Sequence, residues 1–256
     1  MSTLFVSADL GNTRLKLCAW RVHGGSVPEL LEQAILVGPE MAAEAALWLA
    51  QFPAPLRSGM VSVASTQARS EVLEVLAGAG EVLELEHGLE LRCARPESVG
   101  LDRLFAARGA LAQLGCDCIV VDAGTALTVD AILAEGPGVF LGGAIAPGPG
   151  LLARSLAEGA AQLPLVEPHP GSSALGGDTQ HAIRAGVGIG FRGAARELAL
   201  AVAREAGLEA APVVLTGGAR GFLLEPDAVF AVALHENPEL VHMGLLAAAG
   251  LGLGRA

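Results

Sequence analysis

The chain has 256 residues, of which 52% are hydrophobic, and a formal net charge of −11. This length is enough for one large domain or two smaller ones with a substantial core. The negative charge argues against a general affinity for nucleic acid or for anionic membranes. Apolar runs fall short of the about 20 residues that cross a bilayer, and the first residues lack the basic segment and cleavage pattern of a signal peptide, so we expect a cytoplasmic protein.

The first half of the chain is predicted to alternate between strands and helices. It begins with a β-hairpin over residues 1–22 and a Gly/Pro turn over 23–28. Helices are then predicted over residues 40–51, 66–77 and 103–114, and short strands over 60–64, 81–85 and 89–93.

The second half repeats this alternation. A second hairpin starts at residue 117, and a Gly/Pro loop over 142–148 leads into a helix from about residue 150. Residues 164–173 have the composition of a linker. The remaining elements are a helix over 179–206, a strand over 213–216 and a helix over 245–253. The pattern predicts an α/β chain with two domains, 1–114 and 115–256.

Residues 9–13 (DLGNT) and 122–125 (DAGT) share one pattern. Each follows an apolar run and places an acid, a tight glycine turn and a threonine before a second apolar run, which predicts a hairpin with a carboxylate at its tip. Two copies indicate a duplicated fold whose tips face each other across a cleft. Turn N–H groups and Thr hydroxyls bind phosphate oxygens, and carboxylates bind hydrated cations, so the pair predicts a nucleotide site.

Lys16 is the only lysine in the chain, and all the other Lys or Arg positions are arginine. A compact ammonium group on a flexible stem suits a place beside phosphates, which would explain why lysine is kept here. The alternative is a chance survivor on the exposed face of its strand.

Cysteines and histidines form no pattern typical of a metal or redox centre. The four cysteines include a Cys-x-Cys pair at positions 116 and 118 instead of a CxxC motif, and the six histidines are scattered. Reduced thiols are therefore expected, and a transition-metal site is disfavoured.

Residues 100–103 (GLDR) open a predicted helix. One interpretation is capping, with Asp102 at the N-cap accepting from a backbone N–H near residue 105, and this interpretation is the simpler one. The other is functional: Asp102 would take a proton from a hydroxyl, and Arg103 would bind a carboxylate through two hydrogen bonds.

Three further segments have weak signals. Residues 142–148 (GGAIAPG) lack the Lys-Ser/Thr ending of a Walker A loop, which excludes a P-loop kinase. Residues 216–218 (TGG) suit an adenosine or a tight strand–helix turn, and without a Gly-x-Gly-x-x-Gly motif a Rossmann site is disfavoured. Asp178 and Thr179 stand at a helix start, where capping is the simplest interpretation.

Taken in order, these motifs resemble the type III pantothenate kinase family, part of the acetate/sugar kinase, heat-shock chaperone and actin superfamily. The matching segments are residues 9–16, 100–103, 122–128, 142–148, 179–186 and 215–218. The resemblance implies two duplicated ribonuclease H-like domains that flank an ATP cleft. It also implies transfer of the ATP γ-phosphoryl group to pantothenate, which gives 4′-phosphopantothenate in the first step of coenzyme A biosynthesis.

The resemblance assigns roles residue by residue. The segment expected to line the ATP phosphates consists of Asp9, Leu10, Gly11, Asn12, Thr13, Arg14, Leu15 and Lys16. Asp9 would also lie near Mg²⁺, Thr125 would contact ATP, and Asp122 would hold a monovalent cation, K⁺ or NH₄⁺.

On the substrate side, the resemblance makes Asp102 the proton acceptor. The residues expected to contact pantothenate are Gly100, Leu101, Asp102, Arg103 and Thr179. It further implies a homodimer in which the subunit interface completes the pocket.

One position departs from the family pattern. The family usually has a tyrosine three residues before the proline that precedes its Gly-x-Asp-Arg motif; here Cys93 stands three residues before Pro96, and the chain has no tyrosine. Cys93 is therefore expected at an altered wall of the pantothenate pocket.

Two alternatives stay open. A non-catalytic, nucleotide-binding regulatory relative of the same fold would share these motifs, although the intact acids at positions 9, 102 and 122 argue against it. An actin-like or chaperone ATPase would need inserted subdomains for which the chain is too short.

Overall fold

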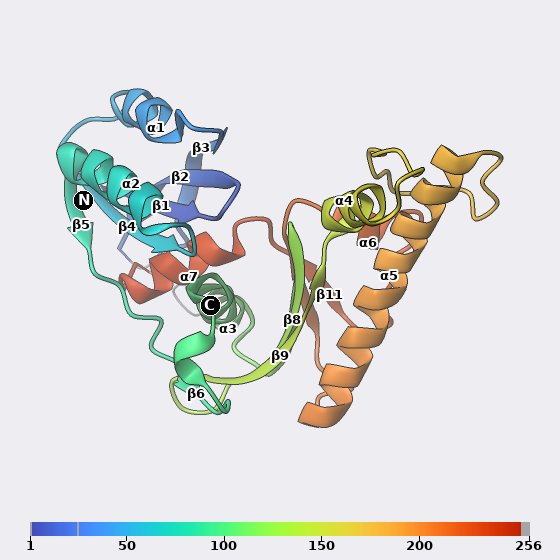
Figure 1. Cartoon of the computed structure of the whole chain (residues 1–256). Coiled ribbons are helices and arrows are strands. Elements are labelled where there is room, and N and C mark those ends of the chain that lie inside the picture. The colour runs from blue at the N-terminus through green and yellow to red at the C-terminus, as the bar shows by residue number, and fades with distance from the viewer. Residues whose placement is uncertain (1, 25, 252–256) are drawn as a thin grey trace.

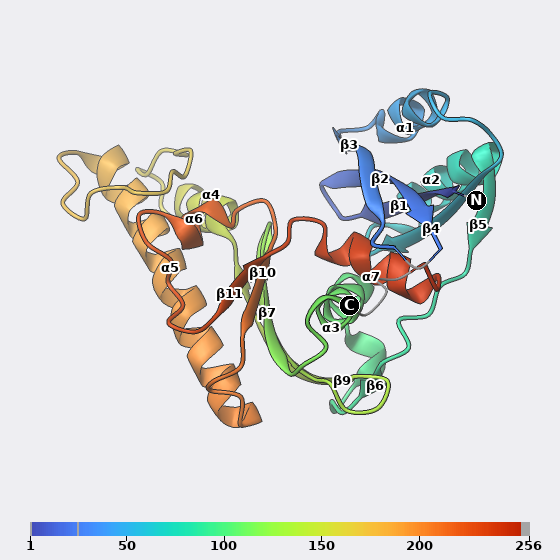
Figure 2. The same cartoon turned by 180° about the vertical axis from the view of Figure 1, so that it is seen from behind.

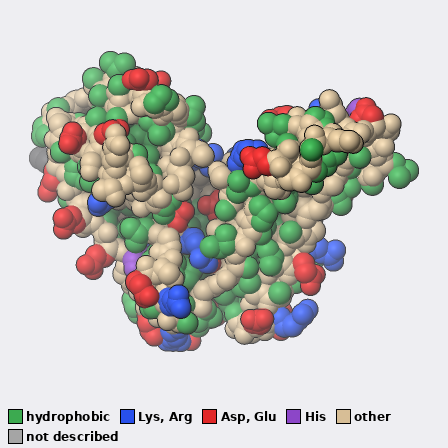
Figure 3. Space-filling view, viewed as in Figure 1, with side chains coloured by type: hydrophobic (Ala, Val, Ile, Leu, Met, Phe, Trp, Pro, Cys, Tyr) green, Lys and Arg blue, Asp and Glu red, His purple; other side chains and the backbone are tan. Residues whose placement is uncertain are grey.

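The computed structural model describes residues 2–24 and 26–251. It contains two β-sheets, one in each of two lobes (Figure 1), and the space-filling view shows a hollow between the lobes (Figure 3). The first sheet has the order β3-β2-β1-β4-β5. Its strands are β1 (Ser2–Leu10), β2 (Arg14–His23), β3 (Glu29–Val37), β4 (Leu56–Ser62) and β5 (Gly80–Leu83).

The second sheet has the order β11-β10-β7-β8-β9-β6. Its strands are β6 (Glu90–Leu91), β7 (Cys118–Ala123), β8 (Ala126–Leu133), β9 (Val139–Pro147), β10 (Val213–Thr216) and β11 (Leu234–Glu236). In both sheets a three-strand antiparallel meander is followed by two parallel strands. Apart from β6, the second sheet thus repeats the strand order and directions of the first.

Helices cover the outer faces of both sheets and fill the space between them (Figures 1 and 2). The helices of the first lobe are α1 (Met41–Leu49) and α2 (Thr66–Ala79). Those of the second lobe are α4 (Pro149–Gly159), α5 (Thr179–Ala206) and α6 (Gly221–Leu224). Between the lobes lie α3 (Leu101–Leu114), which follows the short 3₁₀ turn Pro96–Ser98, and α7 (Leu240–Ala248).

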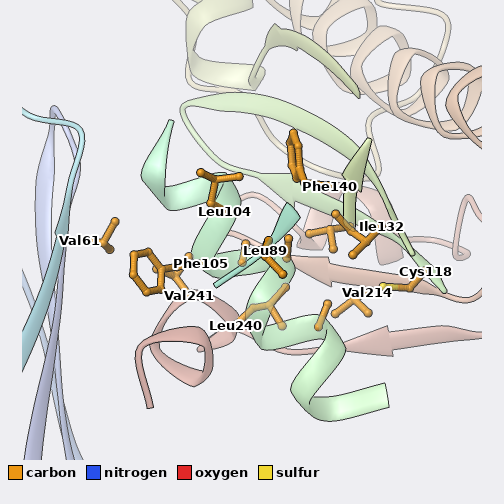
Figure 4. Packing of buried hydrophobic residues seen from close by; sticks show 14 of the residues in the cluster. Val61, Leu89, Leu104, Phe105, Cys118, Ile132, Phe140, Val214, Leu240 and Val241 are labelled. Atoms are coloured by element: carbon orange, nitrogen blue, oxygen red, sulfur yellow. The ribbon is translucent and has the colours of Figure 1, made fainter. Parts of the chain in front are cut away.

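The α3–α7 pair is the packed centre that joins the two lobes. Its buried cluster includes Val61 of β4, Phe105 of α3, Leu240 of α7 and Phe140 of β9 (Figure 4). Two glycines let the helix backbones touch. A Cβ on Gly109 would lie 2.1 Å from the Leu240 carbonyl oxygen, and one on Gly244 would lie 1.9 Å from the Phe105 carbonyl oxygen. No larger residue fits at either crossing point without separating the helices.

Most predicted elements are confirmed, including both hairpins, the helix over 179–206 and the strand over 213–216. The loop predicted over 142–148 is wrong, because residues 139–147 form β9. Gly143 pairs with Asp130 there, at a contact so close that a Cβ would lie 1.8 Å from the Val129 carbonyl oxygen. The last helix begins at Leu240, five residues before its predicted start, and residues 252–253 of that prediction lie outside the described residues.

Besides β9, four elements have no counterpart in the prediction: β3, α6, β11 and the 3₁₀ turn Pro96–Ser98. β3 is an edge strand with exposed apolar side chains such as Ile35 and Val37, so its sequence lacks the alternation of a half-buried strand. α6 and β11 span only four and three residues, too few for a periodic signal. Among the described residues, no helix has the length and apolar character to span a membrane.

Candidate active site

Strand alternation decides which way the first acid points. Val6, Ala8 and Leu10 enter the core beneath α1 and α2, whereas Phe5 packs toward α7. Asp9 shares the α7 side with Phe5, because side chains alternate along a strand. The turn after it is closed by a hydrogen bond from the Gly11 N–H to the Arg14 carbonyl oxygen (3.0 Å). The hairpin therefore presents the Asp9 carboxylate to the space between the lobes.

The second hairpin presents its acid in the same way. Val120 packs with the α3 cluster and Val121 with the α5 cluster, so Asp122 faces α3. The Gly124 N–H donates to the Ala126 carbonyl oxygen (2.9 Å) to close the turn. Gly217 (φ +93°) approaches so closely that a Cβ would lie 2.3 Å from Asp122 Oδ1. The strand–turn segment after β10 therefore packs directly on the second tip.

The third acid, Asp102, lies in the first turn of α3 but does not cap the helix. Gly100 is the N-cap, and Asp102 is the second helical residue, whose Oδ1 accepts from the Arg103 N–H (2.9 Å). A Cβ on Gly100 would lie 2.5 Å from Asp102 Oδ1. The N-cap interpretation of Asp102 is thus wrong, and the glycine makes room for its carboxylate.

Arg103 is engaged by a residue that the motifs do not include. Its guanidinium pairs with Asp130 of β8 and lies over the Phe140 ring, 5.4 Å from the ring centroid. Asp130 is 1% exposed. An acid inside an otherwise apolar strand is the sequence signal that could have identified it, because a buried carboxylate needs a partner.

The tip acids and Asp102 form an electrostatically coupled group. Burial is the largest cause that raises the pKa of Asp9 to about 6, and repulsion from Asp102 adds to it. Burial likewise raises the pKa of Asp122 to about 7, with repulsion from Asp9 and Asp102 acting in the same direction. Arg14 opposes both shifts. The fold therefore brings together the carboxylates of Asp9, Asp102 and Asp122. Acidic and basic side chains are visible in the hollow between the lobes (Figure 3).

A cavity of about 300 Å³ lies between the two tips. Arg14 lines it from the first hairpin, Gly124 and Thr125 from the second, and Gly218 from the turn after β10. The other lining residues come from α4, from the segment after it and from α6, and they are Pro149, Gly150, Leu151, Arg154, Glu167, Pro168, Ala219 and Phe222. Glycines and turn backbone dominate the part of the wall between the hairpins, which suits phosphate oxygens.

Within the predicted phosphate segment the side chains have different surroundings. Leu10 and Leu15 are fully buried in the core of the first lobe, so only their backbone can face the hollow. Asn12 and Thr13 are exposed at the turn. The Lys16 ammonium donates to the Pro238 carbonyl oxygen (2.7 Å) and pairs with Glu239 (3.4 Å), next to the start of α7.

Two predicted substrate residues, Thr179 and Cys93, lie on segments other than those that carry the acids. Thr179 is exposed in the first turn of α5, at the outer edge of the second lobe (Figure 1). The preceding residue caps this helix, as its position predicts: Asp178 Oδ1 accepts from the His181 N–H (2.9 Å). Cys93 follows β6 and is half-buried beside β9, where a Cβ on Gly142 would lie 4.0 Å from its own Cβ.

Among the residues that the structure describes, no group of three or more His, Cys, Asp or Glu side chains has the arrangement of a metal site. Asp9, Asp102 and Asp122 come instead from three separate elements, β1, α3 and β7. Mg²⁺ commonly keeps several waters and takes one or two carboxylates together with substrate phosphates, which matches single acids on separate tips.

Comparison with known proteins identifies the family. The family model described as type III pantothenate kinase matches residues 5–201. The chain belongs to the type III pantothenate kinase family. A type III pantothenate kinase of Dehalococcoides mccartyi is 30% identical over 261 residues, which cover 94% of this chain and 93% of the relative. Another from Azoarcus sp. is 34% identical, covering 93% and 87%, and one from Dechloromonas aromatica is 38% identical, covering 64% and 68%.

Solved structures with the same fold are much more distant in sequence. An inorganic polyphosphate/ATP-glucomannokinase from Arthrobacter sp. strain KM is 14% identical with a TM-score of 0.50, covering 97% of this pantothenate kinase family member and 98% of that chain. An archaeal actin homolog is 12% identical with the same TM-score, covering 97% and 99%. At these identities the comparison establishes the mixed α/β fold with two sheets.

Proposed function

We propose that the chain transfers the γ-phosphoryl group of ATP to a hydroxyl of pantothenate, the first step of coenzyme A biosynthesis. Membership of the type III pantothenate kinase family supports the reaction and the substrate. The observation that carries the proposal in the structure is the coupling of Asp9, Asp102 and Asp122 beside a cavity between two turn tips. Phosphoryl transfer needs such positioning and charge neutralisation more than covalent chemistry.

Asp102 is the proposed proton acceptor. It stands free of the N-cap role, in the first turn of a helix that lies between the lobes. Since the hydroxyl proton leaves late in a loose transition state, a carboxylate suffices to orient the nucleophile and take the proton. The neighbouring Arg103 would bind the substrate carboxylate.

The tips fit ATP and cations. We propose that residues 9–16 and Thr125 bind the nucleotide, with Asp9 at Mg²⁺ and Asp122 at K⁺ or NH₄⁺. The mutual repulsion of the two carboxylates supports this, because a bound cation would relieve it. Bound Mg²⁺ would neutralise charge on the phosphoryl oxygens. Lys16 would add to that neutralisation from the side of α7.

We further propose that the two lobes are duplicated ribonuclease H-like domains, divided into residues 1–114 and 115–256. The matching strand order of the two sheets supports the duplication. α7 would then cross back from the second domain to lie beside α3 of the first. Because ATP is the phosphoryl donor, we place the activity in the cytoplasm.

A homodimer is part of the proposal. Exposed apolar side chains gather on α5 and the segment before it, among them Ile189 (47% exposed) and Leu175 (91%). Exposed apolar side chains of this kind favour contact with a partner, which supports a second copy of the chain at this edge. Thr179 lies apart from the Asp102 of its own chain. In a dimer of this kind it would contact the pantothenate site of the other copy.

The deciding experiment is a coupled ATP-consumption assay with and without pantothenate, in Mg²⁺ and K⁺. Pantothenate-dependent ADP release is expected, together with phosphopantothenate in the product mixture. ATP binding without pantothenate-stimulated turnover would contradict the kinase and favour a regulatory nucleotide-binding protein.

A further inference from the structure

The Arg103 guanidinium is held on two sides. Its Nε donates to Asp130 Oδ2 (3.1 Å), and its Nη2 donates to Asp130 Oδ1. The Phe140 ring lies under its plane at 5.4 Å. Two parallel hydrogen bonds and a ring face fix both the direction and the tilt of the group.

This arrangement leaves one edge of the guanidinium unused. A guanidinium has five N–H donors and can offer two neighbouring edges to carboxylates. Asp130 takes the Nε–Nη2 edge, and within residues 2–24 and 26–251 no hydrogen bond from Nη1 of Arg103 is found. The Nη1–Nη2 edge is therefore available to a second carboxylate.

Asp130 itself lies inside the sheet, where its carboxylate accepts hydrogen bonds from the Arg103 guanidinium. It lies in the interior of β8, paired with Val120 of β7 and Gly143 of β9. A Cβ on Gly143 would lie 2.7 Å from Asp130 Oδ1, so the glycine leaves the space that this carboxylate fills. At 1% exposure Asp130 is shielded from any ligand in the hollow.

We propose that Asp130 is a positioning residue, which presents the free edge of Arg103 to the carboxylate of the substrate. The inference rests on the proposed function and deepens it, because it makes Asp130 a determinant of preference for an acidic acceptor. The hydroxyl of the same substrate is then directed toward Asp102, the residue next to Arg103 in α3. In this role Asp130 acts on the substrate through Arg103 and touches no reacting atom.

A purely structural ion pair would hold α3 on the sheet without any such preference. The two roles differ in which kinetic constant responds and for which ligand. Positioning affects the affinity for a carboxylate, whereas loosening of α3 would affect acidic and uncharged ligands alike.

The experiment compares Asp130→Asn with a matched control, Asp117→Asn. Asp117 lies at the opposite end of the β7–β8 hairpin, where its Oδ1 accepts from the Ala134 N–H (2.7 Å). For each protein we would measure the KM of pantothenate, the KM of ATP, kcat, and the inhibition constant of the uncharged primary amide of pantothenate. In Asp130→Asn the KM of pantothenate should rise about 10- to 100-fold. The KM of ATP and the inhibition constant of the amide should stay within about twofold, and Asp117→Asn should match the wild type.

Equal losses for pantothenate and its amide, or an unchanged KM of pantothenate in a folded Asp130→Asn protein, would overturn the inference while leaving the kinase intact. Absence of pantothenate-dependent turnover in the wild type would overturn the proposed function and this inference with it. Should Asp130→Asn fail to fold, Phe140→Leu loosens the same guanidinium from its other side. A pantothenate-selective loss in that variant supports the positioning role, and an equal effect on the amide refutes it.

Discussion

Asp102 is the residue on which the proposed chemistry depends most directly. Since Gly100 and not Asp102 caps α3, Asp102→Asn removes a charge while keeping the side-chain size and one oxygen acceptor. We expect the thermal unfolding curve to change little and kcat to fall by about a hundredfold or more. A variant with near wild-type kcat would assign Asp102 to the helix start alone.

The tip carboxylates give the metal-free protein a stability that depends on pH. Because the pKa of Asp9 is raised to about 6 and that of Asp122 to about 7, the folded protein binds more protons than the unfolded chain from about pH 4 to pH 7. Their contribution to the free energy of unfolding therefore falls as pH rises through that window. Asp122→Asn relieves the repulsion, so in EDTA its Tm should rise relative to wild type between about pH 5 and about pH 8.

A Tm difference that stays constant over this range would contradict the coupling of the two acids. His242, whose pKa burial lowers to about 3, acts in the opposite direction. His242 is present in both proteins, so its effect cancels in the Tm difference between the variant and the wild type. Added K⁺ or NH₄⁺, the cations proposed for Asp122, should reduce the difference, because only the wild type keeps the Asp122 carboxylate that would bind them.

A substitution of Cys93 tests the proposed pantothenate pocket. If it stands where relatives place a phenol ring, Cys93→Tyr restores contact area and a hydroxyl, and binding should improve by roughly 1–3 kcal/mol. The effect should appear as a lower KM of pantothenate with little change in kcat, because the ring would touch ground and transition states alike. Cys116→Tyr at an exposed position is the control. A raised KM would mean that another side chain already occupies the space.

At this scale the sequence singles out acids by local signals and says little about their partners. Asp9, Asp102 and Asp122 were proposed because each accompanies a local glycine turn or helix start, and their roles stay predictions. Asp130 was missed as a site residue because its meaning depends on Arg103, 27 residues away in the chain. The contact of Lys16 with the Pro238 carbonyl oxygen spans 222 residues and leaves no local signal at all.

Among the elements, the crossing of α3 and α7 is close enough to be sensitive to substitution. A Cβ at Gly244 would overlap the Phe105 carbonyl oxygen, so Gly244→Ala must push the helices apart. We expect a loss of about 1–3 kcal/mol or more in the free energy of unfolding, measured by denaturant titration.

The matched control is Gly186→Ala in α5, where a Cβ would meet nothing within 4 Å. There alanine should stabilise the protein by about 0.5–1 kcal/mol, because it favours the helix. Equal effects of the two substitutions would refute a close crossing of α3 and α7.

The elements also mark where local patterns stop being informative. Helix α5 was predicted with its observed bounds, because its N-cap, its length and its C-terminal glycine are all local signals. Strand β9 was predicted as a loop, because glycines and a proline in sequence favour turns. Gly143 serves the close approach of β8 instead, a requirement that arises only when the sheet has formed.

For the whole molecule we expect a homodimer. Light scattering should give twice the chain mass of 25.8 kDa, and Ile189→Asp on the exposed side of α5 should shift the protein toward the monomer. Leu47→Asp is the control, since this side chain is 74% exposed on α1 of the other lobe. A wild-type monomer at micromolar concentration would contradict the proposed dimer.

The return of α7 to the first lobe has a consequence for biosynthesis. Phe5 and Trp20 are buried against Leu246, and Ser7 is hydrogen-bonded to His242, at a separation of 235 residues. One face of the first sheet thus stays uncovered on the ribosome until α7 has been translated. The nascent chain must carry this apolar face over that interval, when exposed strands are prone to aggregate. Completion of the first lobe therefore waits for α7, although the strands of its sheet lie within residues 2–83.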